Sequence, residues 1–208
     1  MNAPYPREIT SYRDLRLFLD LDLKAHGLSR WTVTQSMKRP EIRFQRALRR
    51  AEWSRTLRGF GRALYAVDRL HLQRLSLLTG ISIPLGVFGP GLSIAHYGSI
   101  VVNPNAKVGA FCRLHSATNL GSYQGLAPTL GDYVYVAPGA VIYGGANIGD
   151  RVSIGANAVV TGTIPSRSTA VGAPARILPD RDSSSAMPPW ISHIMLESAP
   201  LHEEEAFA

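Results

Sequence analysis

The sequence between Phe88 and Pro165 repeats with a period of six residues. A branched aliphatic or aromatic residue recurs at one phase, and the residue after it is often Gly or Ala. A helix needs apolar residues every three to four positions and a simple strand every two, so this period fits neither. It fits a coil of short parallel strands, in which one aliphatic residue per hexapeptide points inward and a small residue lets the chain turn a corner. The repeat positions are Phe88, Ile94, Ile100, Val108, Leu114, Leu120, Leu130, Val136, Ile142, Ile148, Ile154 and Val160.

Three hexapeptides close one triangular coil, which buries its core against the coils above and below it. We therefore predict a mostly β fold with a parallel β-helix over residues 81–178. The repeat stretches to ten residues between Leu120 and Leu130, so residues 122–129 (SYQGLAPT) are expected to project as a loop. Loops that project from a rigid scaffold often determine specificity, and we expect Tyr123 and Gln124 to contact a substrate.

The segments on either side of the repeat have different compositions. Residues 1–80 are predicted to form an α-helical N-terminal segment, with a first helix capped by Ser11 and ending near Gly27, a connection over 31–40, and further helices over 41–58 and 62–78. Residues 179–208 are rich in Asp, Ser, Pro and Glu and are predicted to be a flexible C-terminal tail, in which residues 190–196 suit one short docking helix.

The net charge of +7 is concentrated in the N-terminal segment, which holds 16 of the 22 Lys and Arg residues. The cluster Arg43, Arg46, Arg49 and Arg50 has two interpretations. It is either a solvated helix face, or it attracts an anionic partner such as nucleotide phosphates, an acidic glycan or the inner membrane surface, which would give a weak membrane-surface association. Nucleic acid is not an expected partner, because no recognised binding module accompanies the charge.

Other features of the sequence narrow the class of protein. The single cysteine, Cys112, excludes an internal disulfide framework and is interpreted as a packing residue. There is neither an apolar run of ~18–20 residues nor the apolar core of a secretory signal, so we expect a cytoplasmic protein. The His, Cys and Asp residues lack metal-ligand spacing, so no metal is expected, and the sequence has no P-loop, dinucleotide glycine motif or nucleophile elbow.

Two histidines stand at equivalent places in successive coils. His96 follows Ile94 by two residues, and His115 directly follows Leu114, the next repeat position on the same face. Because stacked coils lie about 4.8 Å apart, we expect both imidazoles near one edge of the β-helix. Imidazole titrates near neutrality and is the commonest general base, so the pair predicts an acid–base site. The alternatives are an ordinary surface histidine for His96, and for His115 a role in orienting His96 or contacting substrate.

The repeat, the segment FGPGLSIAHYGSIVVNPNAKVG (88–109) and the segment IGANAVVTGTIPSRSTAVGAPARI (154–177) resemble the hexapeptide-repeat acetyltransferases. They resemble in particular the serine acetyltransferase-like branch, which includes O-acetyltransferases encoded with bacterial capsule and exopolysaccharide genes. The resemblance covers residues 80–178 and extends in outline to the N-terminal helices. It implies a left-handed parallel β-helix, a homotrimer or a dimer of trimers with active sites between subunits, and acetyl-CoA as the donor.

The resemblance also assigns roles to individual residues. His96 falls on the family's catalytic histidine, in an H-x-G-x-I-V-V setting. The small residues Ala137, Gly155 and Ala156 match the stretch along which CoA lies, and Arg176 in the closing G-x-P-A-R segment is a candidate for the CoA phosphates.

The sequence departs from the serine acetyltransferases at three places that serve the acceptor. Ala95 replaces the Asp before the catalytic histidine, residues 81–84 (ISIP) replace a D-x-H-P segment, and residues 126–128 (LAP) replace an Arg-His-Pro segment. A zwitterionic amino acid needs charged partners, because ionic hydrogen bonds are the strong ones. A sugar hydroxyl needs mainly neutral hydrogen bonds and a stacking surface. Side chains that offer these are Tyr97, Asn103, Asn119 and Tyr123.

These departures favour an acetyl-CoA-dependent O-acetyltransferase that acts on a saccharide, in a capsule or exopolysaccharide or its precursor, by direct transfer assisted by His96. Two alternatives stay open. One is a serine O-acetyltransferase of cysteine biosynthesis, and the other is a trimeric repeat scaffold without catalysis.

Overall fold

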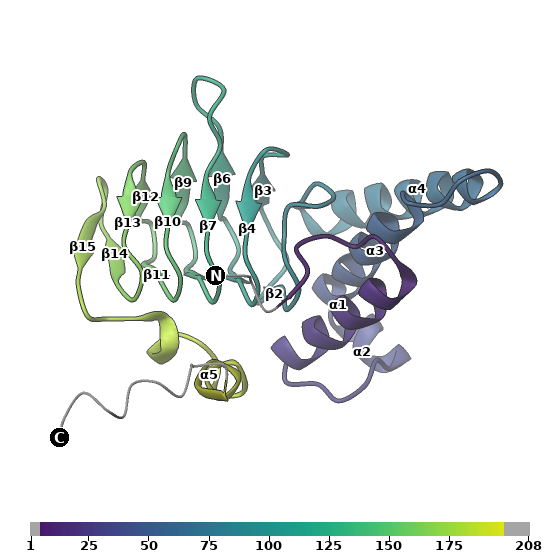
Figure 1. Cartoon of the computed structure of the whole chain (residues 1–208), viewed down its shortest axis with the longest axis horizontal. Helices are drawn as coiled ribbons and strands as arrows, with labels where there is room; N and C mark the ends of the chain where they lie inside the picture. The colour runs from purple at the N-terminus through teal and green to yellow at the C-terminus, as the bar shows by residue number, and fades with distance from the viewer. Residues whose placement is uncertain (1–4, 198–208) are drawn as a thin grey trace.

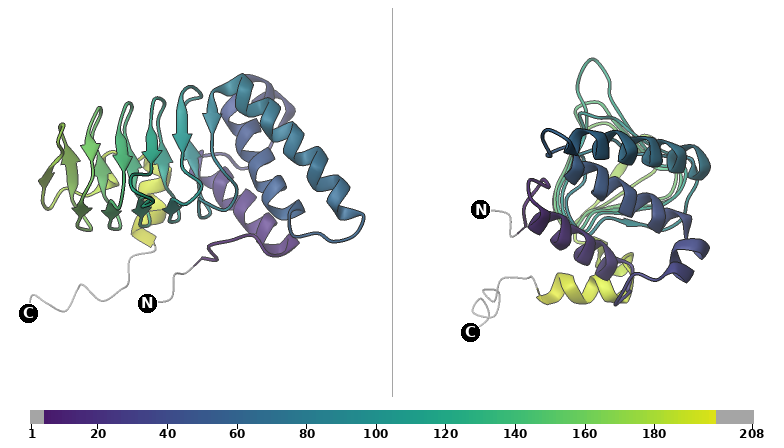
Figure 2. Two further views of the ribbon diagram at one scale, coloured as in Figure 1. Left: turned by 90° about the horizontal axis from the view of Figure 1, so that it is seen from above. Right: turned by 90° about the vertical axis from the view of Figure 1, so that its right-hand side faces the viewer.

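A computed structural model describes residues 5–197, in which a helical segment covers one end of a β-helix (Figure 1). The loop after the β6 strand projects from the stack of coils, as the view in Figure 2 from the helical end also shows. The helices are α1 Tyr12–Ala25, α2 Val33–Lys38, α3 Pro40–Ser54, α4 Gly61–Thr79 and α5 Pro189–Glu197, with a short 3₁₀ helix, η1, at Ser183–Ser185. The strands are β1 Ile81–Ser82, β2 Ser93–Ile94, β3 Ile100–Val102, β4 Lys107–Val108, β5 Arg113–Leu114, β6 Asn119–Gly121, β7 Thr129–Leu130, β8 Tyr135–Val136, β9 Val141–Tyr143, β10 Asn147–Ile148, β11 Ser153–Ile154, β12 Val159–Val160, β13 Thr163–Ile164, β14 Thr169–Val171 and β15 Arg176–Leu178.

The β-helix has the three faces that the six-residue period predicts. The first sheet has the order β1-β3-β6-β9-β12, the second β13-β10-β7-β4, and the third β15-β14-β11-β8-β5-β2. All pairs are parallel except β14 with β15. The twelve repeat positions are each 5% exposed or less, so the inward phase read from the sequence is confirmed. Cys112 is fully buried in the same core, as expected for a packing residue.

Capping residues in the sequence determine where the helices begin and end. Ser11 and Asp14 form a capping box at the start of α1, and Gly80 ends α4 with a left-handed φ of 69°. The predicted connection over 31–40 is partly wrong, because it contains α2, which Thr32 and Gln35 cap in the same way. That helix is only six residues long and has no fully buried residue, so hydrophobic periodicity gives no signal for it.

A buried arginine joins the helical segment to the first coil. Arg49 is 0% exposed and pairs with Asp22 at 2.9 Å and with Glu52 at 3.1 Å. Its guanidinium also donates to the carbonyl oxygens of Phe88 and Gly89, at 2.9 and 2.6 Å. The arginine cluster is therefore not one exposed patch, because Arg49 belongs to the junction and not to the surface.

The C-terminal segment differs from the flexible tail expected from residue 179. The α5 helix docks against α1 and the coils, where Ile191 is 0% exposed, and Trp190 donates through Nε1 to the carbonyl of Ala25 at 3.0 Å. The Ser183 hydroxyl donates to the carbonyl of Tyr133 at 2.6 Å. The short docking helix expected over residues 190–196 is thus present as α5, and residues 198–208 of the predicted tail lie outside the described residues. Among the described residues, none of the helices combines the length and apolar character needed to cross a membrane.

Candidate active site

His96 and His115 lie at the corner where the β2–β5 face of the β-helix turns into the β3–β6 face. The register pairs Ile94 with Leu114, so the two histidines leave adjacent strands at the same end. Their ring centroids are 6.2 Å apart and the rings are tilted by 57°. His96 is exposed and His115 is half-buried. The structure thus places the two imidazoles beside each other, with the more exposed one able to meet a substrate from solvent.

The surroundings of His115 keep its ring neutral. The Tyr135 ring meets it edge-on, with centroids 5.2 Å apart. Burial, with smaller contributions from the charges of Arg113 and His96, lowers the pKa of His115 to about 4. A neutral imidazole at physiological pH both donates and accepts a hydrogen bond, which suits a residue that orients a neighbour or holds a hydroxyl.

A strip of mostly small residues runs along the same corner and includes His115. The strand registers put Ala95, His115, Ala137, Gly155 and Val171 at one level of successive coils. A Cβ at Gly155 would lie 2.9 Å from Cγ1 of Val171, so glycine at this position leaves room for the Val171 side chain of the next coil.

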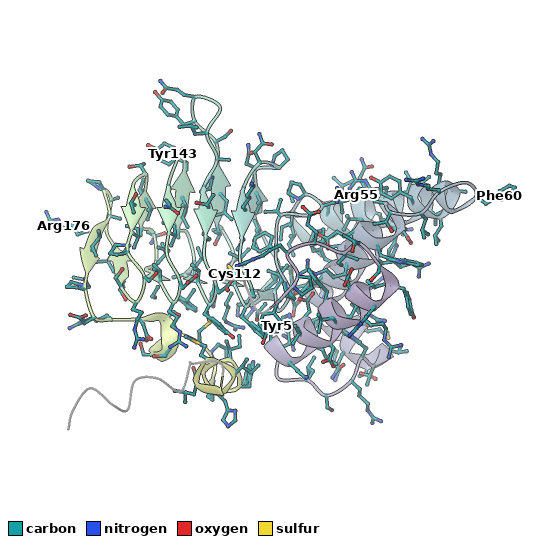
Figure 3. The ribbon with its side chains drawn as sticks, in the orientation of Figure 1. Tyr5, Arg55, Phe60, Cys112, Tyr143 and Arg176 are labelled. Carbon is teal, nitrogen blue, oxygen red and sulfur yellow. The ribbon has the colours of Figure 1, made fainter. Side chains whose placement is uncertain are left out.

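The strip ends beside Arg176, the residue predicted to bind the CoA phosphates. Arg176 is opposite Val171 in the antiparallel β14–β15 pair and is exposed at the end of the stack farthest from the helices (Figure 3). Ala156 is also exposed, next to Gly155. The four residues matched to the CoA stretch, Ala137, Gly155, Ala156 and Arg176, therefore lie along the corner that carries His96 and His115.

The predicted acceptor residues are divided between two edges. Tyr97, which is 57% exposed, lies beside His96, whereas Tyr123 and Gln124 lie in the loop at the opposite end of β6. Asn119 occupies β6 itself, and Asn103 lies near the loop, where its Nδ2 donates to the Ser122 hydroxyl at 2.9 Å. Three residues of strand span ~10 Å, so one chain does not bring the loop and the histidines together.

The loop after β6 has an internal structure that holds its side chains outward. Tyr123 and Leu126 exchange backbone hydrogen bonds of 2.9 and 3.0 Å, and both side chains are about 60% exposed. The Tyr123 ring meets Tyr143 edge-on, with centroids 6.3 Å apart, below the tip of the loop (Figure 3). The loop is thus a short, braced projection, as the stretched repeat predicted.

The sequence analysis missed a cation close to the histidines. Arg113 lies in β5 and His115 directly follows that strand, on either side of the inward-facing Leu114, so both side chains point away from the core. Arg113 is half-buried and donates to the Ser93 hydroxyl at 2.6 Å, and within residues 5–197 no carboxylate forms an ion pair with it. Burial lowers the pKa of its guanidinium. Side chains alternate along a strand, so a functional His115 could have drawn attention to Arg113, which lies two residues before it on the same face.

Within residues 5–197, no group of three or more His, Cys, Asp or Glu side chains is placed to hold a metal ion. The corner instead offers two imidazoles, one guanidinium and a strip of small residues, which is equipment for moving a proton and binding an extended, partly anionic ligand.

The chain is similar to known proteins in family, sequence and fold. Residues 127–162 match the family described as bacterial transferase hexapeptide (six repeats). A serine acetyltransferase of Helicobacter pylori (strain J99) is 38% identical over 122 residues, which cover 56% of this chain and 71% of that protein. One of Mycobacterium tuberculosis (strain H37Rv) is 32% identical over 142 residues, which cover 65% of this chain and 58% of that protein.

Solved structures share the fold. A soybean serine acetyltransferase apoenzyme aligns with a TM-score of 0.63 and 24% identity, over 79% of this chain and 69% of that one. A serine acetyltransferase in complex with CoA aligns with a TM-score of 0.62 and 22% identity, over 80% of this chain and 71% of that one. The sequence match to relatives and the shared β-helix lead to one conclusion: the chain belongs to the serine acetyltransferase family of hexapeptide-repeat acyltransferases, which take their acetyl group from acetyl-CoA.

Proposed function

We propose that this acyltransferase moves the acetyl group of acetyl-CoA to the hydroxyl of serine. The observation that carries the proposal is the 38% identity to a protein named serine acetyltransferase over 71% of that protein's length. A structure with the same fold is described as a Neisseria gonorrhoeae serine acetyltransferase in complex with serine. Family membership therefore outweighs the expectation, drawn from three local departures, that the acceptor is a saccharide.

In the proposed mechanism His96 is the general base. Its imidazole takes the proton from the acceptor hydroxyl as the hydroxyl oxygen attacks the thioester carbonyl. The tetrahedral intermediate then collapses, the C–S bond breaks, and the CoA thiolate recovers a proton from the imidazolium of His96. His115, which stays neutral, orients His96 or holds the acceptor hydroxyl. General-base assistance of this kind contributes about 10²–10⁴-fold in rate.

The donor is proposed to lie along the corner strip. CoA would extend over Ala137, Gly155 and Ala156, where side chains are small, and its phosphates would meet Arg176 at the far end. This path puts the thioester end at the histidines and the charged end at the guanidinium. Arginine suits phosphate because its planar fork makes paired, charge-assisted hydrogen bonds.

Arg113 is proposed to hold the serine carboxylate. The three family segments that supply charged partners are replaced by Ala95, by residues 81–84 and by residues 126–128, so another cation has to serve. Arg113 points away from the core on the same face as His115 and is not paired with a carboxylate among the described residues. A half-buried guanidinium without an anionic partner is costly, and a bound carboxylate would remove that cost.

A saccharide is the second candidate acceptor, and one observation favours it. No described carboxylate forms an ion pair or hydrogen bond with His96 or Tyr97, so the ammonium group of serine lacks an evident partner at the histidine corner. The exposed rings of Tyr97 and Tyr123 suit stacking against a sugar instead. A saccharide of a capsule or exopolysaccharide precursor remains the specific form of this candidate.

The working unit is proposed to be a homotrimer, with the site between subunits. In one chain the loop with Tyr123 and Gln124 lies at the far end of β6 from His96. A second copy packed against the β3–β6 face would bring its loop to the corner of the first copy. Both sides of the acceptor pocket would then be present.

The test is thiol release from acetyl-CoA, with serine in one series and a panel of saccharides in another. Turnover with serine and a KM within about 1 μM–1 mM supports the proposal. Turnover with saccharides alone moves the assignment to the second candidate. Lack of acetyl-CoA binding by calorimetry, in a protein that sediments as a trimer, would leave a non-catalytic scaffold.

A further inference from the structure

A groove lined by both charged and apolar side chains lies in the helical segment and has no residue in common with the histidine corner. It is a groove of about 580 Å³ that touches α1, α2, α3 and α4. Small-molecule sites in proteins commonly have volumes of about 300–1,000 Å³. Its lining residues are Leu15, Leu19, Ser36, Arg43, Arg46, Ala47, Arg50, Val67, Asp68 and His71.

The charge of the groove is unbalanced. Three arginines line it, with Asp68 as its single acidic residue. Arg43, Arg46 and Arg50 follow one another at spacings of three and four residues, so they share one face of α3. Arg50 pairs with Asp68 at 2.9 Å, and the guanidinium of Arg46 lies 4.9 Å from the centroid of the Trp31 ring. The arginines at 43 and 46 therefore have no acidic partner among residues 5–197.

Asp68 has a buried carboxylate oxygen that receives no hydrogen bond. The residue is 5% exposed, and its Oδ1 takes the ion pair with Arg50. Its Oδ2 is buried and is the only side-chain N or O atom of this kind in the described part of the chain without a hydrogen-bond partner. A buried, unsatisfied acceptor typically costs about 1–3 kcal/mol, more when charged, so native structures supply a donor to such an atom.

We infer that this groove binds a small organic anion that also carries a hydrogen-bond donor, either a hydroxyl or an ammonium group. The anionic group meets Arg43 and Arg46, and the donor meets Oδ2 of Asp68. Leu15, Ala47 and Val67 supply apolar contact for the carbon skeleton between them. A sugar phosphate and an acidic amino acid both have this chemistry, because each joins an anion to a donor within a few bonds.

The test is calorimetric titration of the full chain with four probes. Glucose 6-phosphate and L-glutamate each combine an anion with a donor, whereas inorganic phosphate and glucose each have one element of that chemistry. We expect glucose 6-phosphate, L-glutamate or both to bind at least ~10-fold more tightly than phosphate and glucose, with a Kd of about 1 μM–1 mM, the range in which enzyme KM values fall. Binding of the first alone assigns a sugar phosphate, and binding of the second alone an amino acid.

Variants locate the binding in the groove. Arg43→Gln should weaken the bound probe about 10-fold, whereas Arg16→Gln, at an exposed arginine on α1 outside the groove, should leave its Kd unchanged. Asp68→Asn should reduce the preference for the combined probe over phosphate, and thermal unfolding confirms that each variant is folded. The inference is overturned if neither combined probe binds at ~10 mM, or if Arg43→Gln leaves binding intact. Acetyl transfer is measured separately, so a lack of ligand binding in the groove leaves the proposed acetyltransferase reaction unaffected.

Discussion

At the scale of single residues, His96 is expected to carry the proton transfer. His96→Ala should lower kcat for thiol release by about 10²–10⁴-fold, because the acceptor hydroxyl loses its base while the exposed side chain has little part in packing. His193→Ala, at an exposed histidine on α5, is the matched control and should retain wild-type kcat. Near wild-type turnover by a folded His96→Ala protein would end the assignment.

Arg113 is expected to act on acceptor binding more than on the chemical step. Arg113→Met should raise the KM for serine at least ~10-fold and leave the KM for acetyl-CoA within about twofold, since a charge-assisted contact to carboxylate is lost. Arg113→Lys should restore part of the affinity. A merely structural role would instead lower the Tm and affect both substrates alike, and this result would return the choice to a neutral acceptor.

The positions of single side chains were predicted correctly where the repeat itself determines them. The neighbouring placement of His96 and His115 follows from counting hexapeptides, because the coil converts sequence spacing into stacked positions. Arg113 was missed because only the inward positions were used, although it alternates with His115 across the inward-facing Leu114. Arg49 was assigned to a surface cluster because charge alone does not tell a buried ion pair from a solvated one.

At the scale of elements, the loop after β6 should be separable from the fold. Replacing residues 123–126 with four glycines should leave the Tm within ~2 °C, because Tyr123 and Leu126 are exposed and the loop makes few core contacts. The same change should lower kcat/KM for the acceptor by about 10-fold or more while sparing acetyl-CoA binding. A large fall in Tm would show that the loop supports the coils instead of the acceptor.

The junction between α3 and the first coil should depend strongly on Arg49. Arg49→Leu leaves Asp22 and Glu52 buried without their cation, and removing one partner of a buried pair typically costs about 3–5 kcal/mol. Urea unfolding measures the loss. Arg55→Leu, at an exposed arginine just beyond the same helix, should change stability by less than ~0.5 kcal/mol. Equal effects of the two substitutions would mean that the junction is not where the helical segment is held.

At the scale of the whole molecule, the sequence predicted the β-helix better than the parts that pack against it. Every hexapeptide places an apolar residue at the same inward position, so the pattern stays recognisable even if one of the twelve positions is misread. The α5 helix has no repeat, and its docking surface is built from Leu21, Phe111 and Tyr133, which come from distant parts of the chain. Such long-range contacts are set by the assembled fold and leave only a faint local pattern.

His26 links the pH to the stability of the assembled molecule. It is 5% exposed where α1 meets α3, its Nε2 lies 3.0 Å from Oε1 of Gln45, and Arg39 approaches its Nδ1 at 3.1 Å. Gln45 in turn donates to the carbonyl of Leu92 on the first coil. Burial lowers the pKa of His26 below its ordinary value of 6.5, and Arg39 and Arg113 lower it further, against opposing contributions from Gln45 and Asp22. Protonation would place an N–H on Nδ1 against the guanidinium of Arg39.

The sign of the pH effect follows from that lowered pKa. The unfolded chain takes up a proton on His26 as the pH falls through about 6.5, while the folded chain resists it, so this contribution to stability is present above pH 6.5 and is lost below it. Urea unfolding at pH 7.5 and at pH 5 should show a fall in the free energy of unfolding for the wild type and a smaller fall for His26→Gln. His193→Gln, at an exposed histidine, should follow the wild type. Equal falls in the wild type and His26→Gln would place the acid sensitivity elsewhere, with the half-buried His115 as the next residue to test.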